Sequence, residues 1–102
     1  LEIMARVVQY SVYIMANVHA TVFYIGVTSN LEQRVWQHKQ GEGGFFTSKY
    51  NCHCLLYYED YQHIAKAIER EKQLKNWHRD WKLNLVKQEN PKLKDLAENW
   101  YL

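Results

Sequence analysis

The chain has 102 residues, of which 47% are hydrophobic and 24% charged, a composition typical of one folded domain with a modest core. The net charge of +2 is too small to indicate nucleic-acid binding by itself, and no apolar run approaches the roughly 20 residues of a membrane-spanning helix. Cys52 and Cys54 lie two positions apart and are poor disulfide partners, so we expect a reducing, cytoplasmic setting without a membrane.

Two strands joined by a short loop are expected at the start of the chain, at residues 7–16 and 21–28. If residues 17–20 form the turn, the register places Tyr13 directly opposite Tyr24 on one face of the hairpin. The other face is more apolar, and a one-residue slip would mix the two faces. We therefore expect the two phenols to be cross-strand neighbours.

A helix is expected over residues 31–40, because Asn30 is a typical N-cap and Gly41 a typical stop. Apolar periodicity and the residues at their ends predict three later elements, and Asn90-Pro91 is expected to end the last of them. They are a third strand at residues 53–59 and helices at residues 62–77 and 79–88.

The order β-β-α-β-α-α predicts a small single α+β domain with a three-stranded, mainly antiparallel sheet flanked by helices. We expect this domain to span residues 4–102, and residues 1–3, which precede Met4, to be a cloning remnant. Residues 61–88 carry seven Lys or Arg against three acidic residues. This excess suggests a surface that faces phosphate, although a solvated helix face would explain it equally well.

Glu71 is the residue that packing explains least. Helical spacing places it on one ridge with four apolar residues, Ile64, Ala67, Ile68 and Leu74. A carboxylate on a buried ridge costs free energy unless a cation or a metal compensates its charge. The alternatives are a structural ion pair, for example with Arg34, or an edge residue that reaches solvent.

Arg34 and Tyr24 are candidates for a different reason, which is their access to a substrate. The Arg34 guanidinium can bind a phosphate through two hydrogen bonds while its stem packs on Leu31 and His38. Gly26 lies beyond Tyr24 on the same face, and we expect the missing side chain to leave space for a substrate. The alternatives are a surface arginine without a partner and an aromatic pair that only packs.

Taken together, these residues resemble the GIY-YIG nuclease domain, and most closely its small single-domain bacterial members. No single motif is decisive, but their order and spacing are, and the resemblance covers essentially the whole chain. The motifs are Val12-Tyr13-Ile14, Tyr24-Ile25-Gly26, Asn30-Leu31-x-x-Arg34-Val35-x-x-His38, Phe46-Thr47-x-Lys49-Tyr50, Ala67-Ile68-x-Arg70-Glu71-Lys72-x-Leu74-Lys75 and Asn90-Pro91. Ser11 stands where the family has a glycine, which removes no reacting group.

The resemblance implies a role for each matching residue. Tyr13 and Tyr24 match the two motif tyrosines, Arg34 the catalytic arginine and Glu71 the metal-binding glutamate, with Mg²⁺ or Mn²⁺ as cofactor. His38 matches a histidine found in some branches, and Lys49 a position that similar proteins place near DNA. Lys75 and Arg34 are further candidate phosphate contacts. Asn84 is out of step with a family asparagine and is not assigned.

The implied function is a metal-dependent endonuclease that hydrolyses DNA phosphodiester bonds in repair or recombination, with structure-selective or nonspecific cutting. One tyrosine, Tyr13 by preference, would accept the proton of the attacking water. DNA binding should be weak and salt-dependent, so a protein partner is a possible source of targeting. The alternatives are a silent domain of the same fold that binds nucleic acid or a partner, and a purely structural domain.

Overall fold

The computed structural model describes residues 9–102, so the expectations for residues 1–3 and for the first two positions of the first strand lie outside it. One antiparallel sheet contains β1 (Tyr10–Ala16), β2 (Phe23–Thr28) and β3 (Cys54–Tyr61) in the order β2-β1-β3. The helices are α1 (Leu31–Lys39), α2 (Phe45–Lys49), α3 (Ile64–Asn76) and α4 (Arg79–Glu89). The predicted α+β architecture is confirmed, with the short helix α2 as an unpredicted addition.

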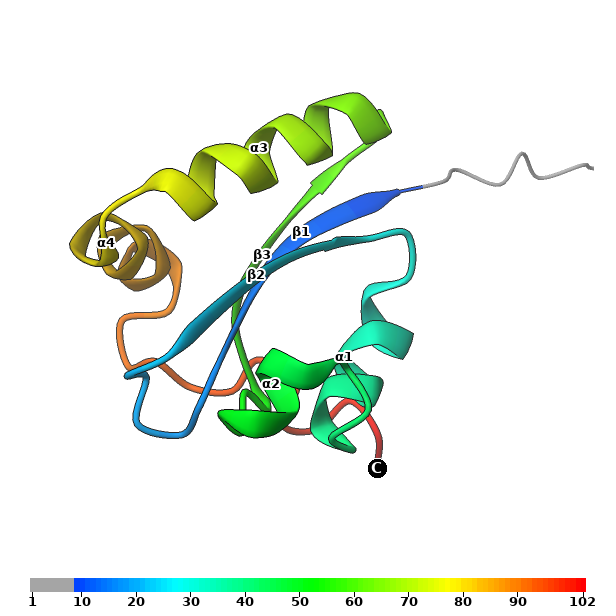
Figure 1. Ribbon diagram of the computed structural model, residues 1–102, viewed down its shortest axis with the longest axis vertical. Coiled ribbons are helices and arrows are strands. Elements are labelled where there is room, and N and C mark those ends of the chain that lie inside the picture. The colour runs from blue at the N-terminus through cyan, green and yellow to red at the C-terminus, as the bar shows by residue number, and fades with distance from the viewer. Residues whose placement is uncertain (1–8) are drawn as a thin grey trace, which may run out of the picture.

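The sheet is covered on both sides. Figure 1 shows α3 and α4 on one side and α1 and α2 on the other. Side chains of the central strand β1 alternate between two buried clusters, as a strand period of two requires. The α3 side contains Val12, Ile14, Ala16, Ile25, Ala67 and Leu74, and the α1 side contains Tyr13, Met15, Val35, Cys52, Leu55 and Ala97.

The predicted register of the first hairpin is wrong by two residues. Tyr13 pairs with Gly26, and Tyr24 lies diagonal to Tyr13 instead of opposite it. The loop is longer than expected, over residues 17–22, because the Asn17 side chain accepts hydrogen bonds from two backbone N–H groups of that loop at 2.8 and 3.0 Å. A two-residue shift keeps every side chain on its predicted face, so the two tyrosines still share one face.

The start and end of α1 agree with the prediction. The Asn30 side chain accepts a hydrogen bond from the backbone N–H of Gln33 at 3.2 Å, and Gly41 has a φ of 77° just after the helix. After α4, the chain returns along the α1 side of the sheet, where the Leu96 N–H donates to the Leu55 carbonyl at 2.8 Å. Within residues 9–102, no helix has the length and apolar character needed to cross a membrane.

Candidate active site

Three aromatic side chains pack against one another on the α1 side of the sheet. The ring centroids of Tyr13 and Tyr24 are 6.3 Å apart, and both rings lie within 5.6 Å of the His38 ring. Tyr13 and His38 are completely buried, whereas Tyr24 is half-buried. Two strands and α1 therefore place three predicted residues in one cluster.

A chain of hydrogen bonds runs through the buried part of this cluster. The Tyr13 hydroxyl lies 2.8 Å from Nε2 of His38, and Nδ1 of His38 lies 3.0 Å from the Thr47 hydroxyl. That hydroxyl also lies 3.5 Å from the Gly44 carbonyl, which can only accept. If Thr47 donates to Gly44, it accepts from the His38 Nδ1–H, and Nε2 is left to accept the hydrogen of Tyr13.

Burial shifts the pKa values of both partners in opposite directions. Burial, with the neighbouring Tyr24 and the Glu71 charge adding to it, raises the pKa of Tyr13 to about 12, although the Arg34 guanidinium opposes this shift. Burial and the charge of Arg34 lower the pKa of His38 to about 4. At neutral pH the resting state is therefore a protonated phenol beside a neutral imidazole.

Thr47 is a site residue that the sequence analysis did not single out. It lies on α2, is 1% exposed, and contacts the predicted residue His38. Its only sequence signal was its place in the Phe46-Thr47-x-Lys49-Tyr50 motif, because a threonine in a short polar segment gives no sign that it is buried.

Arg34 extends from α1 to the glycine-rich segment before α2. Its Nη1 donates to Oε1 of Gln37 at 2.9 Å, and its Nη2 donates to the Gly43 carbonyl at 2.7 Å. A guanidinium has five N–H donors, so others stay available for a phosphate. Among residues 9–102, no salt bridge joins Arg34 to Glu71, so the ion pair with Arg34 that was given above as an example is not formed, and Glu71 pairs with Lys75 instead.

Two glycines allow the buried rings to fit. A β-carbon on Gly43 would lie 2.0 Å from Nδ1 of His38, and one on Gly26 would lie 2.5 Å from the Tyr13 phenol. The space beside Gly26, which we expected a substrate to use, is thus filled by Tyr13. That prediction is wrong because the register shift brings Tyr13 opposite the glycine.

Glu71 lies between the buried residues Ala67 and Leu74 on α3, and its side chain is 16% exposed. The predicted ridge is only partly correct, because Ile64 and Ile68 are 45% and 37% exposed. These two isoleucines lie outside the narrow stripe of α3 that meets the sheet, whose buried members are Ala67 and Leu74. The Glu71 carboxylate lies 3.5 Å from the Lys75 ammonium, and its charge is close enough to contribute to the raised pKa of Tyr13.

A groove of about 300 Å³ lies next to these residues, along the edge strand β2. Three consecutive β2 residues line it, together with Phe46 from α2, Lys75 from α3 and Lys82 from α4. Lys82 was not predicted, whereas Lys75 was. Asn84 instead lines a separate groove beside Trp77 and Trp81, and Lys49 lies on the exposed side of α2.

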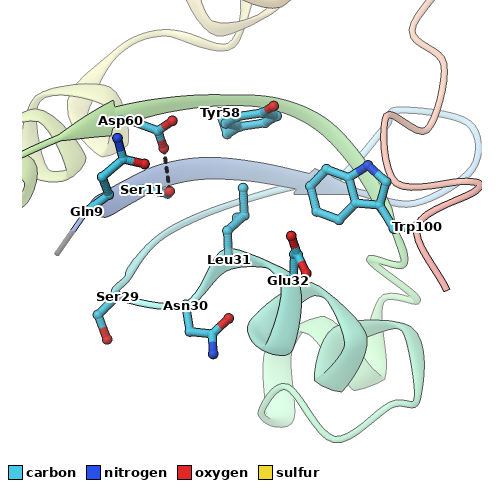
Figure 2. A pocket seen from close by; sticks show the side chains of 9 residues that line it. All are labelled: Gln9, Ser11, Ser29, Asn30, Leu31, Glu32, Tyr58, Asp60 and Trp100. Atoms are coloured by element: carbon cyan, nitrogen blue, oxygen red, sulfur yellow. Dashed lines mark hydrogen bonds between the residues drawn. The ribbon is translucent and has the colours of Figure 1, made fainter. Parts of the chain in front are cut away.

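A second, polar cavity of about 350 Å³ contains none of the predicted site residues. Figure 2 shows it between the start of α1, Trp100 and the end of the sheet where β1 begins and β3 ends. There the Ser11 hydroxyl donates a hydrogen bond to Asp60 at 2.6 Å. Its lining includes two carboxylates, Glu32 and Asp60, and no Lys or Arg. A phosphate would be repelled there, so the β2 groove is the better candidate site.

The comparison with known protein families agrees with this arrangement. The family model described as the GIY-YIG catalytic domain matches residues 9–84, which is more than half of the chain. The chain belongs to the GIY-YIG family. The matched segment of this GIY-YIG chain contains every candidate site residue predicted from the sequence.

The proteins similar to this GIY-YIG chain include several UPF0213 proteins, a name that states no activity. It is 31% identical over 65 residues to a UPF0213 protein of Staphylococcus haemolyticus, which covers 64% of this chain and 79% of the relative. It is 32% identical, also over 65 residues, to a UPF0213 protein of Staphylococcus aureus strain N315. The solution NMR structure of a UPF0213 protein from Bacillus halodurans matches with a TM-score of 0.55 at 21% identity, covering 89% of this chain and 97% of that one, which supports the fold alone.

The donor set of this GIY-YIG site can hold a hard divalent ion only together with a substrate. Residues 9–102 contain no cluster of three His, Cys, Asp or Glu side chains. Mg²⁺ keeps several waters and binds through one or two carboxylates plus substrate phosphate oxygens. Glu71 alone is therefore a fitting protein ligand, provided that Lys75 releases its carboxylate.

Proposed function

We propose that this chain is a metal-dependent endonuclease that hydrolyses DNA phosphodiester bonds. Membership of the GIY-YIG family gives the coarser statement, which is a nuclease-superfamily domain. The observation that supports the finer proposal most is the buried contact of Tyr13 with His38, together with the guanidinium of Arg34 and the carboxylate of Glu71, which lie near enough to act on the pKa of Tyr13. A fold kept only for packing gains nothing from burying these polar groups together.

Tyr13 and His38 form the proton-accepting pair in this proposal. A phenol whose pKa is about 12 is a poor base while it keeps its own proton. In this proposal Nε2 of the neutral His38 imidazole takes the hydroxyl proton of Tyr13 as Tyr13 accepts the proton of the attacking water. Because the pKa of His38 is only about 4, this transfer requires that the negative charge developing on the phosphate favours the imidazolium. Tyr24, which lines the β2 groove, orients that water or the phosphate.

Arg34 and Glu71 handle the charge of the reaction. The free N–H groups of Arg34 stabilise the extra negative charge of the phosphorane-like transition state. Glu71 would hold Mg²⁺ or Mn²⁺, and such an ion, when bound, stabilises charge on the scissile phosphate and the leaving oxygen.

Lysines around the groove provide the contacts with the DNA backbone. Lys75 and Lys82 line the groove, and Lys49 lies on α2, the helix that contributes Phe46 to the groove. With a net charge of only +2, binding is weak and falls with salt. We therefore propose structure-selective or nonspecific cutting in DNA repair or recombination in the cytoplasm, with targeting by a protein partner.

The test compares Glu71→Gln with Glu69→Gln, a matched control on the exposed side of the same helix. Plasmid, single-stranded, nicked and branched DNA are incubated with Mg²⁺, with Mn²⁺ or with chelator. We expect cleavage by the unchanged protein and by Glu69→Gln in the presence of metal, and none by Glu71→Gln, with all three proteins melting alike. A fully active Glu71→Gln protein would contradict the proposal, and DNA binding without cleavage by the unchanged protein would favour the silent-domain alternative.

A further inference from the structure

Helix α2 buries a polar side chain and exposes aromatic ones, the reverse of what is usual for a helix that packs on a sheet. It buries Thr47 at 1% exposure, whereas Phe45 and Phe46 are 81% and 42% exposed. Tyr50, directly after the helix, is 41% exposed. Because exposing phenyl rings to water is unfavourable, such a cluster on a small domain indicates a surface that binds something.

Two of the exposed rings lie beside the ammonium group of Lys49. The Lys49 ammonium lies 5.7 Å from the centroid of the Phe45 ring and 5.4 Å from that of Tyr50, and the Phe46 and Tyr50 rings are 4.8 Å apart. We call Phe45, Phe46, Lys49 and Tyr50 the aromatic patch. Flat apolar faces beside an ammonium group match the two parts of a nucleotide, which are a base that stacks and a phosphate that is negative.

The aromatic patch is continuous with the candidate active site. The Phe46 ring lies 6.1 Å from the ring of Tyr24, and Phe46 lines the β2 groove together with Lys75 and Lys82. The short helix is also fixed in place, because Thr47 bonds to His38 and the Cys52 N–H donates to the Thr47 carbonyl at 2.9 Å. A strand whose backbone follows the lysines of the groove would bring its bases to the rings of α2.

We propose that the aromatic patch is a stacking platform for unpaired nucleobases. It makes single-stranded DNA, or the unpaired part of a branched DNA, the preferred substrate class of the β2 groove. In a duplex the faces of the bases are already stacked on one another, so the exposed rings of α2 can be used only where a strand is open. This inference rests on the proposed nuclease function and adds the substrate class to it.

The test measures binding in chelator, so that no cleavage occurs, by fluorescence anisotropy with a labelled single strand and with the duplex of the same sequence. We expect Phe45→Ala to weaken binding of the single strand by about 5- to 150-fold, the range that base stacking on an aromatic residue supplies. Binding of the duplex should change less than twofold. Since Phe45 is largely exposed, this variant is expected to keep its fold.

Two further variants separate stacking from general apolar contact. Phe45→Trp keeps an aromatic face and should bind the single strand at least as well as the unchanged protein, whereas Phe45→Leu keeps an apolar side chain and should bind as weakly as Phe45→Ala. Val18→Ala, at an apolar position that is 78% exposed in the β1–β2 loop, is the control and should change nothing.

The outcomes distinguish this inference from the nuclease proposal. Equal losses for single strand and duplex, or full binding by Phe45→Leu, would overturn the platform. So would a change of oligomeric state in Phe45→Ala without a change in DNA binding, which would indicate a contact between copies of the chain. If single strands bind in a way that depends on the Phe45 ring but are not cleaved in Mg²⁺ or Mn²⁺, the nuclease proposal is wrong and the proposal of a stacking platform is still supported.

Discussion

The phenol ring of Tyr13 fills the space that a side chain on Gly26 would occupy. The two residues are paired in the β1–β2 ladder, and a β-carbon on Gly26 would lie 2.5 Å from both Cζ and the hydroxyl oxygen of Tyr13. Tyr13 is 1% exposed, so its ring can move away from a new side chain only by displacing buried neighbours. The glycine of the second motif is thus required by the tyrosine of the first.

We therefore expect Gly26→Ala to lower the free energy of unfolding by about 1–3 kcal/mol through overpacking, and to reduce cleavage by displacing the Tyr13 hydroxyl. Urea denaturation and a plasmid-cleavage assay measure the two effects. The control is the same substitution in a Tyr13→Ala background, where the clash is absent and the loss of stability should be much smaller. Equal losses in both backgrounds would contradict the steric explanation.

The same residue pair shows which parts of the site could be predicted from sequence. The alternation of apolar and polar side chains placed Tyr13 and Tyr24 on one face, because a strand period of two survives any even shift in register. The register itself depends on hydrogen bonds that the Asn17 side chain makes in the loop, and those are invisible in the pattern. Likewise, the role of Thr47 depends on the packing of α2 against His38.

For α3, the position of Glu71 could be predicted but not the width of the stripe that the sheet covers. Helical spacing correctly grouped it with Ala67 and Leu74. It also included Ile64 and Ile68, because the sequence pattern shows that a residue is apolar but not whether another part of the protein covers it. The family resemblance implied that residues from two strands and two helices meet in one site. No local sequence pattern could have predicted that meeting.

His38 should make stability depend on pH. Burial lowers the pKa of folded His38 to about 4 from an ordinary value of 6.5, so between these values the unfolded chain binds the proton and the folded chain does not. The contribution of neutral His38 is complete above pH 6.5 and is lost as the pH falls toward 4, a change on the order of 3 kcal/mol.

Urea denaturation of the unchanged protein at pH 7, 6, 5 and 4.5 measures this dependence, and His38→Gln should flatten it over that range. Exposed His19 provides the control, because His19→Gln removes a histidine that is in contact with solvent and should leave the dependence intact. If His38→Gln and the unchanged protein lose stability in parallel, the imidazole is not the group responsible.

The two tyrosines should differ in what their hydroxyl groups contribute. Tyr13→Phe removes the partner of the buried His38 Nε2, so we expect a stability loss of about 1–3 kcal/mol and a kcat lowered by about 10²- to 10⁴-fold. Tyr24→Phe removes a hydroxyl at the half-buried groove wall and should have a smaller effect on both. Circular dichroism melts and steady-state cleavage rates decide the matter, and a larger loss of kcat in Tyr24→Phe would reverse the two assignments.

Thr47 is expected to act as a positioning residue through His38. Its hydroxyl lies 3.0 Å from Nδ1, and accepting the hydrogen of that nitrogen keeps Nε2 free for the proton of Tyr13. Thr47→Val keeps the shape but removes the acceptor, so the imidazole can take the other tautomer, in which Nε2 carries the hydrogen. We expect kcat to fall at least about tenfold, as for the loss of other groups that orient a reacting imidazole.

Thr47→Ser separates this role from simple packing, because it keeps the hydroxyl and loses only a methyl group. It should restore most of the cleavage rate even if it melts lower than Thr47→Val. The ¹⁵N chemical shifts of the His38 ring report the tautomer directly, with Nδ1 protonated in the unchanged protein and in Thr47→Ser, and Nε2 protonated in Thr47→Val. Unchanged shifts in Thr47→Val, together with a full cleavage rate, would mean that the hydroxyl of Thr47 does not orient the imidazole and that Tyr13 and Gly43 alone hold the ring.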